Sequence, residues 1–211
     1  MNSQFGLVVA VIVLSYFLGA IPTAYVVGRL RNVNIFEVGS GNMGATNISR
    51  SLGLAWGILV WIVDSLKGIV AILLSVHILP SNPALASTLA AIASVIGHNW
   101  SAIVALITGT LRGGKGASTA WGTLLIIAPV QALVGFLVAL AVVIATRFVS
   151  LGVLVMFSLV TLWTLVLIAQ GVVAPIYTLY FVVIAGLIFI RFRENIDRLL
   201  RGTERKLGER T

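Results

Sequence analysis

The sequence contains no cysteine, only two histidines and little charge. Without cysteine the chain can form neither a disulfide framework nor a thiolate metal site. With only His77 and His98 as imidazoles, a histidine-rich metal site is not expected, and we predict no metal and no cofactor. Charged residues make up 9% of the 211 residues and hydrophobic residues 59%. A soluble domain of this size cannot bury so much apolar surface, so the composition predicts an all-α polytopic membrane protein.

The few charges are mostly positive, with 14 Lys and Arg against 6 Asp and Glu and a net charge of +8. Such an excess also occurs in nucleic-acid-binding proteins. In a membrane protein it more often marks the cytoplasmic face and contacts to anionic head groups or phosphates. We therefore expect membrane lipids, and no nucleic acid, among the partners.

Long apolar stretches predict the membrane spans. They cover residues 5–27, 54–79, 84–107, 119–146, 151–169 and 173–190. All but the fourth have a suitable length for one helix across about 30 Å of hydrocarbon. The first lacks the basic leader and cleavage site of a signal peptide, so we expect an uncleaved span.

The fourth stretch contains Pro129, which either kinks one helix or begins a second one after a tight turn. Two crossings at Pro129 place every Lys and Arg except Lys67 on one face, as the positive-inside rule prefers. We therefore predict about seven transmembrane helices, with the N-terminus outside and the C-terminus in the cytoplasm. The piece 116–128 is then too short to cross alone and must be sheltered by other helices.

We expect residues 1–211 to form one membrane-integral domain, with cytoplasmic segments at about 38–53, 111–119 and 191–205. The polar stretch 191–211 is predicted to be a short helix at the membrane interface, or else a solvated tail.

The first cytoplasmic segment contains the pattern G-x-G-x-x-G at Gly39, Gly41 and Gly44. A dinucleotide site needs a strand before these glycines, but an amphipathic connection precedes them and a membrane span follows. Glycines still allow backbone N–H groups to converge on an anion. Further donors for phosphate are Ser40, Asn42, Thr46, Asn47 and Arg50.

The second segment, "LRGGKGAST" at 111–119, nearly forms a Walker A loop. Gly116 stands where that loop needs Ser or Thr, so an NTPase is not indicated. Gly113, Gly114 and Gly116 beside Lys115 at a helix start still predict an anion site. The plain alternatives are a glycine-rich turn for the first segment and an ordinary basic loop for the second.

The third segment, "RFRENIDRLLRGTER" at 191–205, combines several arginines, Arg193 among them, with Asn195. Glu194 and Arg198 are spaced i, i+4 and could simply stabilise a helix. Three segments with residues suited to phosphate binding, all on one face of the membrane, suggest two phosphorylated ligands.

Together, "GSGNMGATNISRSLG", "GGKGAST" and "RENIDRLLRGTE" resemble the three signature motifs of the bacterial integral-membrane acyl-phosphate:glycerol-3-phosphate acyltransferases, the PlsY family. "DSLKG" (64–68) and "RFVSL" (147–151) are further matches. The resemblance implies a seven-helix protein of the bacterial inner membrane whose active site is on or near the cytoplasmic face. It implies transfer of a fatty acyl group from acyl phosphate to the 1-hydroxyl of glycerol 3-phosphate. The products would be lysophosphatidic acid and phosphate, for phospholipid biosynthesis.

The resemblance also assigns residues to roles. It gives site positions to Ser40, Thr46, Arg50 and Ser150, an essential amide to Asn195 and a structural role to Glu194. The glycine loop corresponds to the glycerol-phosphate-binding motif, with Lys115 as the leading cation. The complete prediction names as catalytic Ser40, Lys115 and Asn195; as substrate-binding Gly41, Asn42, Thr46, Arg50, Gly113, Gly114, Gly116, Ser150 and Arg193; and as structural Asp64, Lys67 and Glu194.

Two positions depart from the family pattern. Phe192 stands where a histidine is common, and the usual His-x-x-Pro becomes "HNWS" at 98–101. Either change could alter substrate preference or weaken activity.

No Ser-His-Asp constellation is present, and neither histidine is a convincing base. His77 is expected at the outer interface, and His98 in a structural or hydrogen-bonding role. Asp64 and Lys67 could neutralise one another or contact substrate. We therefore expect the departing acyl phosphate to accept the proton, with positioning and cations supplying the acceleration. The alternative is a transporter of a phosphorylated or anionic small molecule, which short helices and a lysine at a helix start would also suit.

Overall fold

The computed structural model describes residues 2–209, and the regular structure in that range is helical apart from one isolated bridge between Ser101 and Arg112. The predicted all-α class is confirmed. The helices are α1 (Asn2–Ala20), α2 (Thr23–Leu30), α3 (Ala45–Leu52), α4 (Leu54–Ile78), α5 (Pro83–Asn99), α6 (Ala102–Thr108), α7 (Ala117–Ile127), α8 (Pro129–Thr146), α9 (Val149–Ala169), α10 (Tyr177–Arg191) and α11 (Arg193–Leu200).

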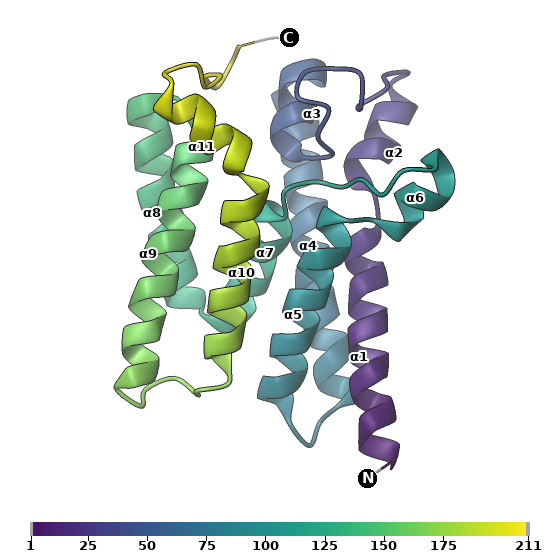
Figure 1. Cartoon of the computed structure of the whole chain (residues 1–211), viewed down its shortest axis with the longest axis vertical. Coiled ribbons are helices and arrows are strands. Elements are labelled where there is room, and N and C mark those ends of the chain that lie inside the picture. Colours follow the sequence, from purple (N-terminus) through teal and green to yellow (C-terminus); the bar gives the residue numbers. More distant parts are fainter. Residues whose placement is uncertain (1, 210–211) are drawn as a thin grey trace.

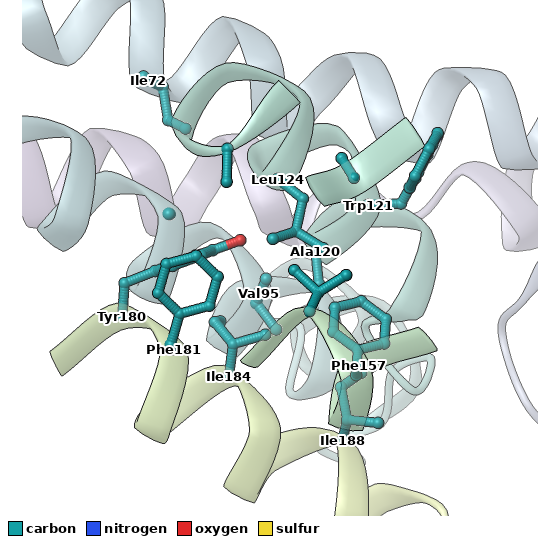
Figure 2. Close-up of a cluster of buried hydrophobic side chains, with 14 of the residues drawn as sticks. Ile72, Val95, Ala120, Trp121, Leu124, Phe157, Tyr180, Phe181, Ile184 and Ile188 are labelled. Atoms are coloured by element: carbon teal, nitrogen blue, oxygen red, sulfur yellow. The ribbon is translucent and has the colours of Figure 1, made fainter. Parts of the chain in front are cut away.

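The longer helices run along the long axis of the molecule in two groups (Figure 1). Helices α1, α4 and α5 pack together on one side, and α8, α9 and α10 stand on the other. The short helix α7 packs against α4, α5 and α8 and so connects the groups. Buried side chains from α5, α7, α9 and α10 form the core where the groups meet, among them Val95, Leu124, Phe157 and Ile184 (Figure 2). Helices α3 and α11 cap the end of the bundle that is remote from the start of α1 (Figure 1).

The break at Pro129 is confirmed as the start of a new helix. Helix α7 ends at Ile127 and α8 begins at Pro129, whose missing N–H costs nothing in a first turn. Eleven residues give α7 a length of only about 16 Å. Its middle is buried from Thr119 to Leu124, so other helices shelter it as expected. A Cβ on Gly122 would lie 2.0 Å from the Ser65 carbonyl oxygen, so this glycine permits close contact with α4.

Two predicted spans are interrupted. The stretch 5–27 was expected to be one helix, but α1 ends at Ala20 and α2 begins at Thr23, because Pro22 has no N–H to continue the helix. The buried ammonium of Lys67 donates to the Ile21 carbonyl at 3.1 Å and satisfies an acceptor at the break.

The stretch 84–107 was also expected to be continuous, but α5 ends at Asn99 and α6 follows separately. The Ser101 hydroxyl caps α6 by accepting from the Val104 N–H, and it donates to the Ala20 carbonyl at 2.6 Å. The last span begins at Tyr177 rather than at residue 173, after a turn that contains Pro175.

Four segments are long and apolar enough to cross a membrane: Gln4–Leu30, Leu54–Ile78, Pro129–Thr146 and Val149–Ala169. Helices α7 and α10 are shorter and apolar. The count of seven crossings and the orientation of the termini stay predictions. The stretch after α10 is confirmed to contain a short helix, α11. Its place at the membrane interface also stays a prediction.

Candidate active site

The three predicted cytoplasmic segments border one cavity of about 280 Å³. Its polar end is formed by the loop before α3, the starts of α3 and α7, the start of α9, and the segment from α11 to Arg205. Its apolar part continues between α4, α7, α8 and α9 and is lined by Trp61, Trp121, Phe136, Ala139, Leu140, Val143, Val149, Gly152, Val153 and Met156. The site therefore joins a polar region to an apolar slot.

The loop before α3 is held in shape by one buried amide. Gly39 and Gly41 have positive φ values of 59° and 66°, which turn the chain sharply. The Asn47 side chain accepts from the Ser40 N–H at 2.9 Å and donates to the carbonyls of Ile35, Val38 and Asn42. Asn47 was expected to donate hydrogen bonds to an anion. Its side chain instead forms its hydrogen bonds with the backbone of the loop that contains Ser40.

The glycine loop is packed against the end of α5. A Cβ on Gly113 would lie 2.2 Å from the His98 carbonyl oxygen, and one on Gly114 would lie 2.0 Å from His98 Nε2. The Gly114 N–H donates to the His98 carbonyl at 3.0 Å, and Arg191 donates twice to the Gly114 carbonyl. These two glycines permit tight packing that fixes the neighbouring Lys115.

Two helix starts border the cavity. Helix α7 begins after Gly116, whose φ is 81°, and α3 begins after Gly44, and neither start carries a side-chain cap. Gly116, Ala117 and Ser118 of one start, and Gly44, Ala45 and Thr46 of the other, line the cavity. Uncapped N–H groups and the helix dipole favour an anion at each start.

A chain of hydrogen bonds connects the second and third segments. Lys115 Nζ donates to Asn195 Oδ1, and Asn195 Nδ2 donates to Glu204 Oε1 at 2.6 Å. The Ser150 hydroxyl donates to the same carboxylate oxygen at 2.8 Å. Arg198 Nε donates to Glu204 Oε2, also at 2.8 Å. The predicted residues Lys115, Asn195 and Ser150 therefore meet around one carboxylate.

The polar end of the cavity carries more positive than negative charge. Glu204 is the acidic residue that lines the cavity, against the cations of Lys115, Arg50, Arg198 and Arg205. Burial lowers the pKa of Lys115 to about 8, and Arg198 acts in the same direction. Burial opposes ionisation of Glu204, but hydrogen bonds from Arg198, Asn195 and Ser150 prevail and lower the pKa of its carboxyl. Excess positive charge beside an apolar slot suits an amphiphile with a phosphate head.

Arg50 is positioned by a contact with the far end of the chain. Its Nη2 donates to the Arg205 carbonyl at 3.1 Å, whereas its buried Nε has no partner among the described residues. An unused guanidinium donor in the cavity wall suits a phosphate oxygen. Phe192 contacts a second cation of the cavity, because Lys115 Nζ lies 5.1 Å from the centre of the Phe192 ring.

Asp64 and Lys67 form the buried ion pair that their spacing suggested, with 2.8 Å between Oδ1 and Nζ. Asp64 Oδ1 also accepts from the Thr23 hydroxyl at 2.8 Å and lies 3.8 Å from His98 Nδ1. The pair lies outside the cavity lining and joins α4 to the break between α1 and α2.

The cavity collects only part of the predicted set. The predicted residues that line the cavity are Ser40, Asn42, Thr46, Arg50, Lys115, Gly116, Ser150 and Asn195. The predicted residues outside the lining are Gly41, Asp64, Lys67, Gly113, Gly114, Arg193 and Glu194. Arg193 and Glu194 are exposed. Arg198 forms its ion pair with Glu204 rather than with Glu194, the partner that the i, i+4 spacing suggested.

Glu204 was not predicted as a site residue, although "RGTER" lies within the third segment. Nothing in a charged tail marks one carboxylate for burial. His98 was expected in a structural or hydrogen-bonding role, and it also lines the cavity. Among the described residues no group of three or more His, Cys, Asp or Glu could hold a metal ion.

Comparison with known proteins shows the family of this chain. The family model of glycerol-3-phosphate acyltransferase matches residues 9–202. The chain belongs to the glycerol-3-phosphate acyltransferase family. It is 42% identical to glycerol-3-phosphate acyltransferase 2 of Moorella thermoacetica, over 95% of this chain and 97% of that protein. It is 37% identical to the enzyme of Halalkalibacterium halodurans, over 93% of each chain.

The fold is that of a solved member of the family. The chain superimposes on the crystal structure of PlsY, an integral membrane glycerol 3-phosphate acyltransferase, in its glycerol 3-phosphate form. The TM-score is 0.83 at 35% identity, with 95% of this chain and 96% of that chain covered. The lysophosphatidic acid form of PlsY gives a TM-score of 0.81. This chain is therefore an acyltransferase and an integral membrane protein.

Proposed function

We propose that this acyltransferase transfers a fatty acyl group from acyl phosphate to the 1-hydroxyl of glycerol 3-phosphate, producing lysophosphatidic acid and inorganic phosphate. One observation carries the proposal: a single cavity joins a cationic region with two uncapped helix starts to an apolar slot. The cationic region with its helix starts suits phosphate groups, and the apolar slot suits a hydrocarbon chain. Membership of the acyltransferase family supports the same reaction.

Each region of the cavity has a role in this scheme. Lys115 and the start of α7 bind the phosphate of glycerol 3-phosphate, and Asn195 orients Lys115. Arg50, Ser40 and the start of α3, where Thr46 lies, bind the acyl phosphate head. The slot between α8 and α9 receives the acyl chain.

The reaction balances without a protein base. The 1-hydroxyl oxygen attacks the acyl carbonyl carbon, and a new C–O bond forms while the bond from that carbon to the phosphate oxygen breaks. The departing phosphate takes the hydroxyl proton. The protein aligns the reactants and stabilises negative charge with its cations and backbone N–H groups. His98 is the residue that tests this view, because it lines the cavity. If His98→Gln folds and binds both substrates but is inactive, the proton passes through the protein instead.

The decisive experiment follows phosphate release from palmitoyl phosphate in detergent, with and without glycerol 3-phosphate. We expect release that depends on glycerol 3-phosphate. Loss of a charge-assisted contact predicts at least about a 100-fold decrease for Lys115→Ala and about a tenfold decrease for Ser40→Ala. Lys206→Ala is the matched control, because Lys206 is exposed and outside the cavity lining. Uptake of glycerol 3-phosphate into sealed vesicles without product would instead support a transporter.

We further propose that the cavity opens toward the cytoplasm from the bacterial inner membrane. The cationic segments that line the cavity support this placement, because basic loops concentrate on the cytoplasmic side.

A further inference from the structure

A second groove, separate from the cavity, lies between the end of α2, the loop after it and the α6 region. Its volume is about 330 Å³, and it shares no lining residue with the cavity. The lining residues are Tyr25, Arg29, Asn34, Phe36, Glu37, Ile107, Thr108, Thr110 and Arg112.

Two guanidinium groups in this groove are held on aromatic rings. Arg29 lies 5.1 Å from the centre of the Tyr25 ring, and its Nε donates to the Tyr25 hydroxyl at 3.1 Å. Arg112 lies 5.2 Å from the centre of the Phe36 ring, and the two rings are 5.9 Å apart. Stacking on adjacent rings fixes both cations at the same groove and leaves their outer N–H groups available.

The cations are not neutralised by neighbouring acids. Within residues 4–209 neither Arg29 nor Arg112 forms an ion pair. Glu37 is the acidic residue of the groove, and its Oε1 accepts from Asn34 Nδ2 at 2.6 Å. Two positive charges against one carboxylate leave the groove positive.

The surroundings of the groove are apolar and exposed. Leu30 is 72% exposed, Leu106 87% and Leu111 55%. Arg29 stands at the end of the apolar segment Gln4–Leu30, one of the candidate spans. Exposed apolar side chains beside paired cations are the pattern expected where hydrocarbon gives way to head groups.

We propose that this groove binds the head group of an anionic phospholipid, with its phosphate between the Arg29 and Arg112 guanidinium groups. The acyl chains then cover Leu106 and Leu111. Paired guanidinium groups match phosphate oxygens, and basic residues at a membrane surface attract anionic lipid. A free phosphate presents similar oxygens and at least as much negative charge, but it leaves the apolar rim uncovered, which favours the lipid.

The test measures lipid bound to the purified full-length protein, by native mass spectrometry in detergent with added phosphatidylglycerol or phosphatidylcholine. The wild type should bind phosphatidylglycerol preferentially. Each arginine contributes about a fivefold difference in affinity, so Arg29→Gln should weaken binding about fivefold and the double variant with Arg112→Gln about 25-fold.

Arg31→Gln is the matched control, because Arg31 stacks on Trp56 outside the groove. The affinity of this variant for phosphatidylglycerol should stay within about twofold of the wild-type affinity. Equal loss in the control, equal binding of phosphatidylcholine, or unchanged binding in the double variant would overturn the proposal. Displacement of the lipid by inorganic phosphate of equal affinity would also overturn it. Arg29→Gln should keep its acyltransferase activity in detergent, so this test can fail or succeed independently of the proposed reaction.

Discussion

At the residue scale, Lys115 couples the site to pH. Its pKa is lowered to about 8, so the ammonium is charged below that pH and loses its charge as pH rises through it. If the charged form binds the substrate phosphate, kcat/KM should fall about tenfold per pH unit well above pH 8. Lys115→Arg, which stays charged, should have lower activity but no such decline.

A pH series of the phosphate-release assay compares the wild type, Lys115→Arg and the exposed control Lys206→Arg. An alkaline decline that is the same in all three proteins would assign it to another group.

Glu204 organises the polar end of the cavity through three side chains. Glu204→Gln keeps an acceptor for Ser150 and Asn195 but removes the ion pair with Arg198, so we expect kcat/KM to fall about tenfold and stability by about 1–3 kcal/mol. Because the folded-state pKa is lowered, this stabilisation is complete above the ordinary pKa and is lost as pH falls through the lowered pKa. The difference in thermal stability from the wild type should therefore narrow in acid.

Asp197→Asn provides the matched control for Glu204. It removes a surface ion pair with Arg201 whose side chains are 55% and 72% exposed. The stability change should stay below about 0.5 kcal/mol. Equal effects of the two substitutions would mean that Glu204 is only one more surface charge.

At the element scale, the short helix α7 depends on its glycine contact with α4. Gly122→Ala should lower stability by about 1–3 kcal/mol, because its Cβ would meet the Ser65 backbone and must push the helices apart. Gly186→Ala in α10 is the control, since a Cβ there meets nothing within 4 Å, and it should stabilise by about 0.5–1 kcal/mol. Thermal unfolding in detergent measures both.

Helices α4, α7 and α8 also close the inner part of the apolar slot. The Trp121 and Phe136 rings are 4.9 Å apart, and Trp61 stacks within 6.4 Å of both. The distance along α8 from Phe136 to the end of the helix is about 15 Å. This distance is roughly half the thickness of the hydrocarbon core, and so about the length of one acyl chain. Phe136→Ala should therefore shift preference from palmitoyl to stearoyl phosphate several-fold, up to about 15-fold for two methylenes.

Competition between the two acyl phosphates measures this preference directly. Phe189→Ala on the exposed face of α10 should leave the ratio unchanged. An unchanged ratio in Phe136→Ala would mean that the acyl chain does not reach these rings.

At the scale of the whole molecule, the lack of cysteine allows a clean test of topology. We predict that Ser81→Cys, between α4 and α5, reacts with an impermeant maleimide in intact cells. Thr203→Cys, after α11, should react only after lysis. The opposite pattern would reverse the orientation, and labelling of both positions in intact cells would refute the predicted number of crossings.

Hydrophobicity, charge parity and one proline predicted the helical class, the break at Pro129 and the sheltered α7. The interruptions at Pro22 and Trp100 were not predicted. The first has a local signal, because Pro22 itself cannot continue a helix. The second has none, because local composition there allowed a longer helix and the contacts that hold the break come from elsewhere. Lys67 reaches the Ile21 carbonyl, and Ser101 bonds to Ala20 and Arg112.

Motif and residue type predicted which polar residues should gather, and the roles assigned to those residues stay predictions. The convergence of Ser40, Lys115, Ser150 and Asn195 on one cavity agrees with the expected grouping. The burial of Glu204 and the use of Asn47 as a scaffold could not be predicted, because both depend on which backbone groups and cations the fold places nearby.

The contact between Arg50 and Arg205 joins two parts of the cavity wall that lie 155 positions apart in the chain. The C-terminal segment is attached by polar contacts, those of Glu204 among them, whereas the bundle beneath it is joined by a broad apolar core. Such a segment opens at a lower free energy than the bundle. On gradual heating, catalysis should therefore be lost several degrees before the helical signal, and brief heat inactivation should be reversible on cooling.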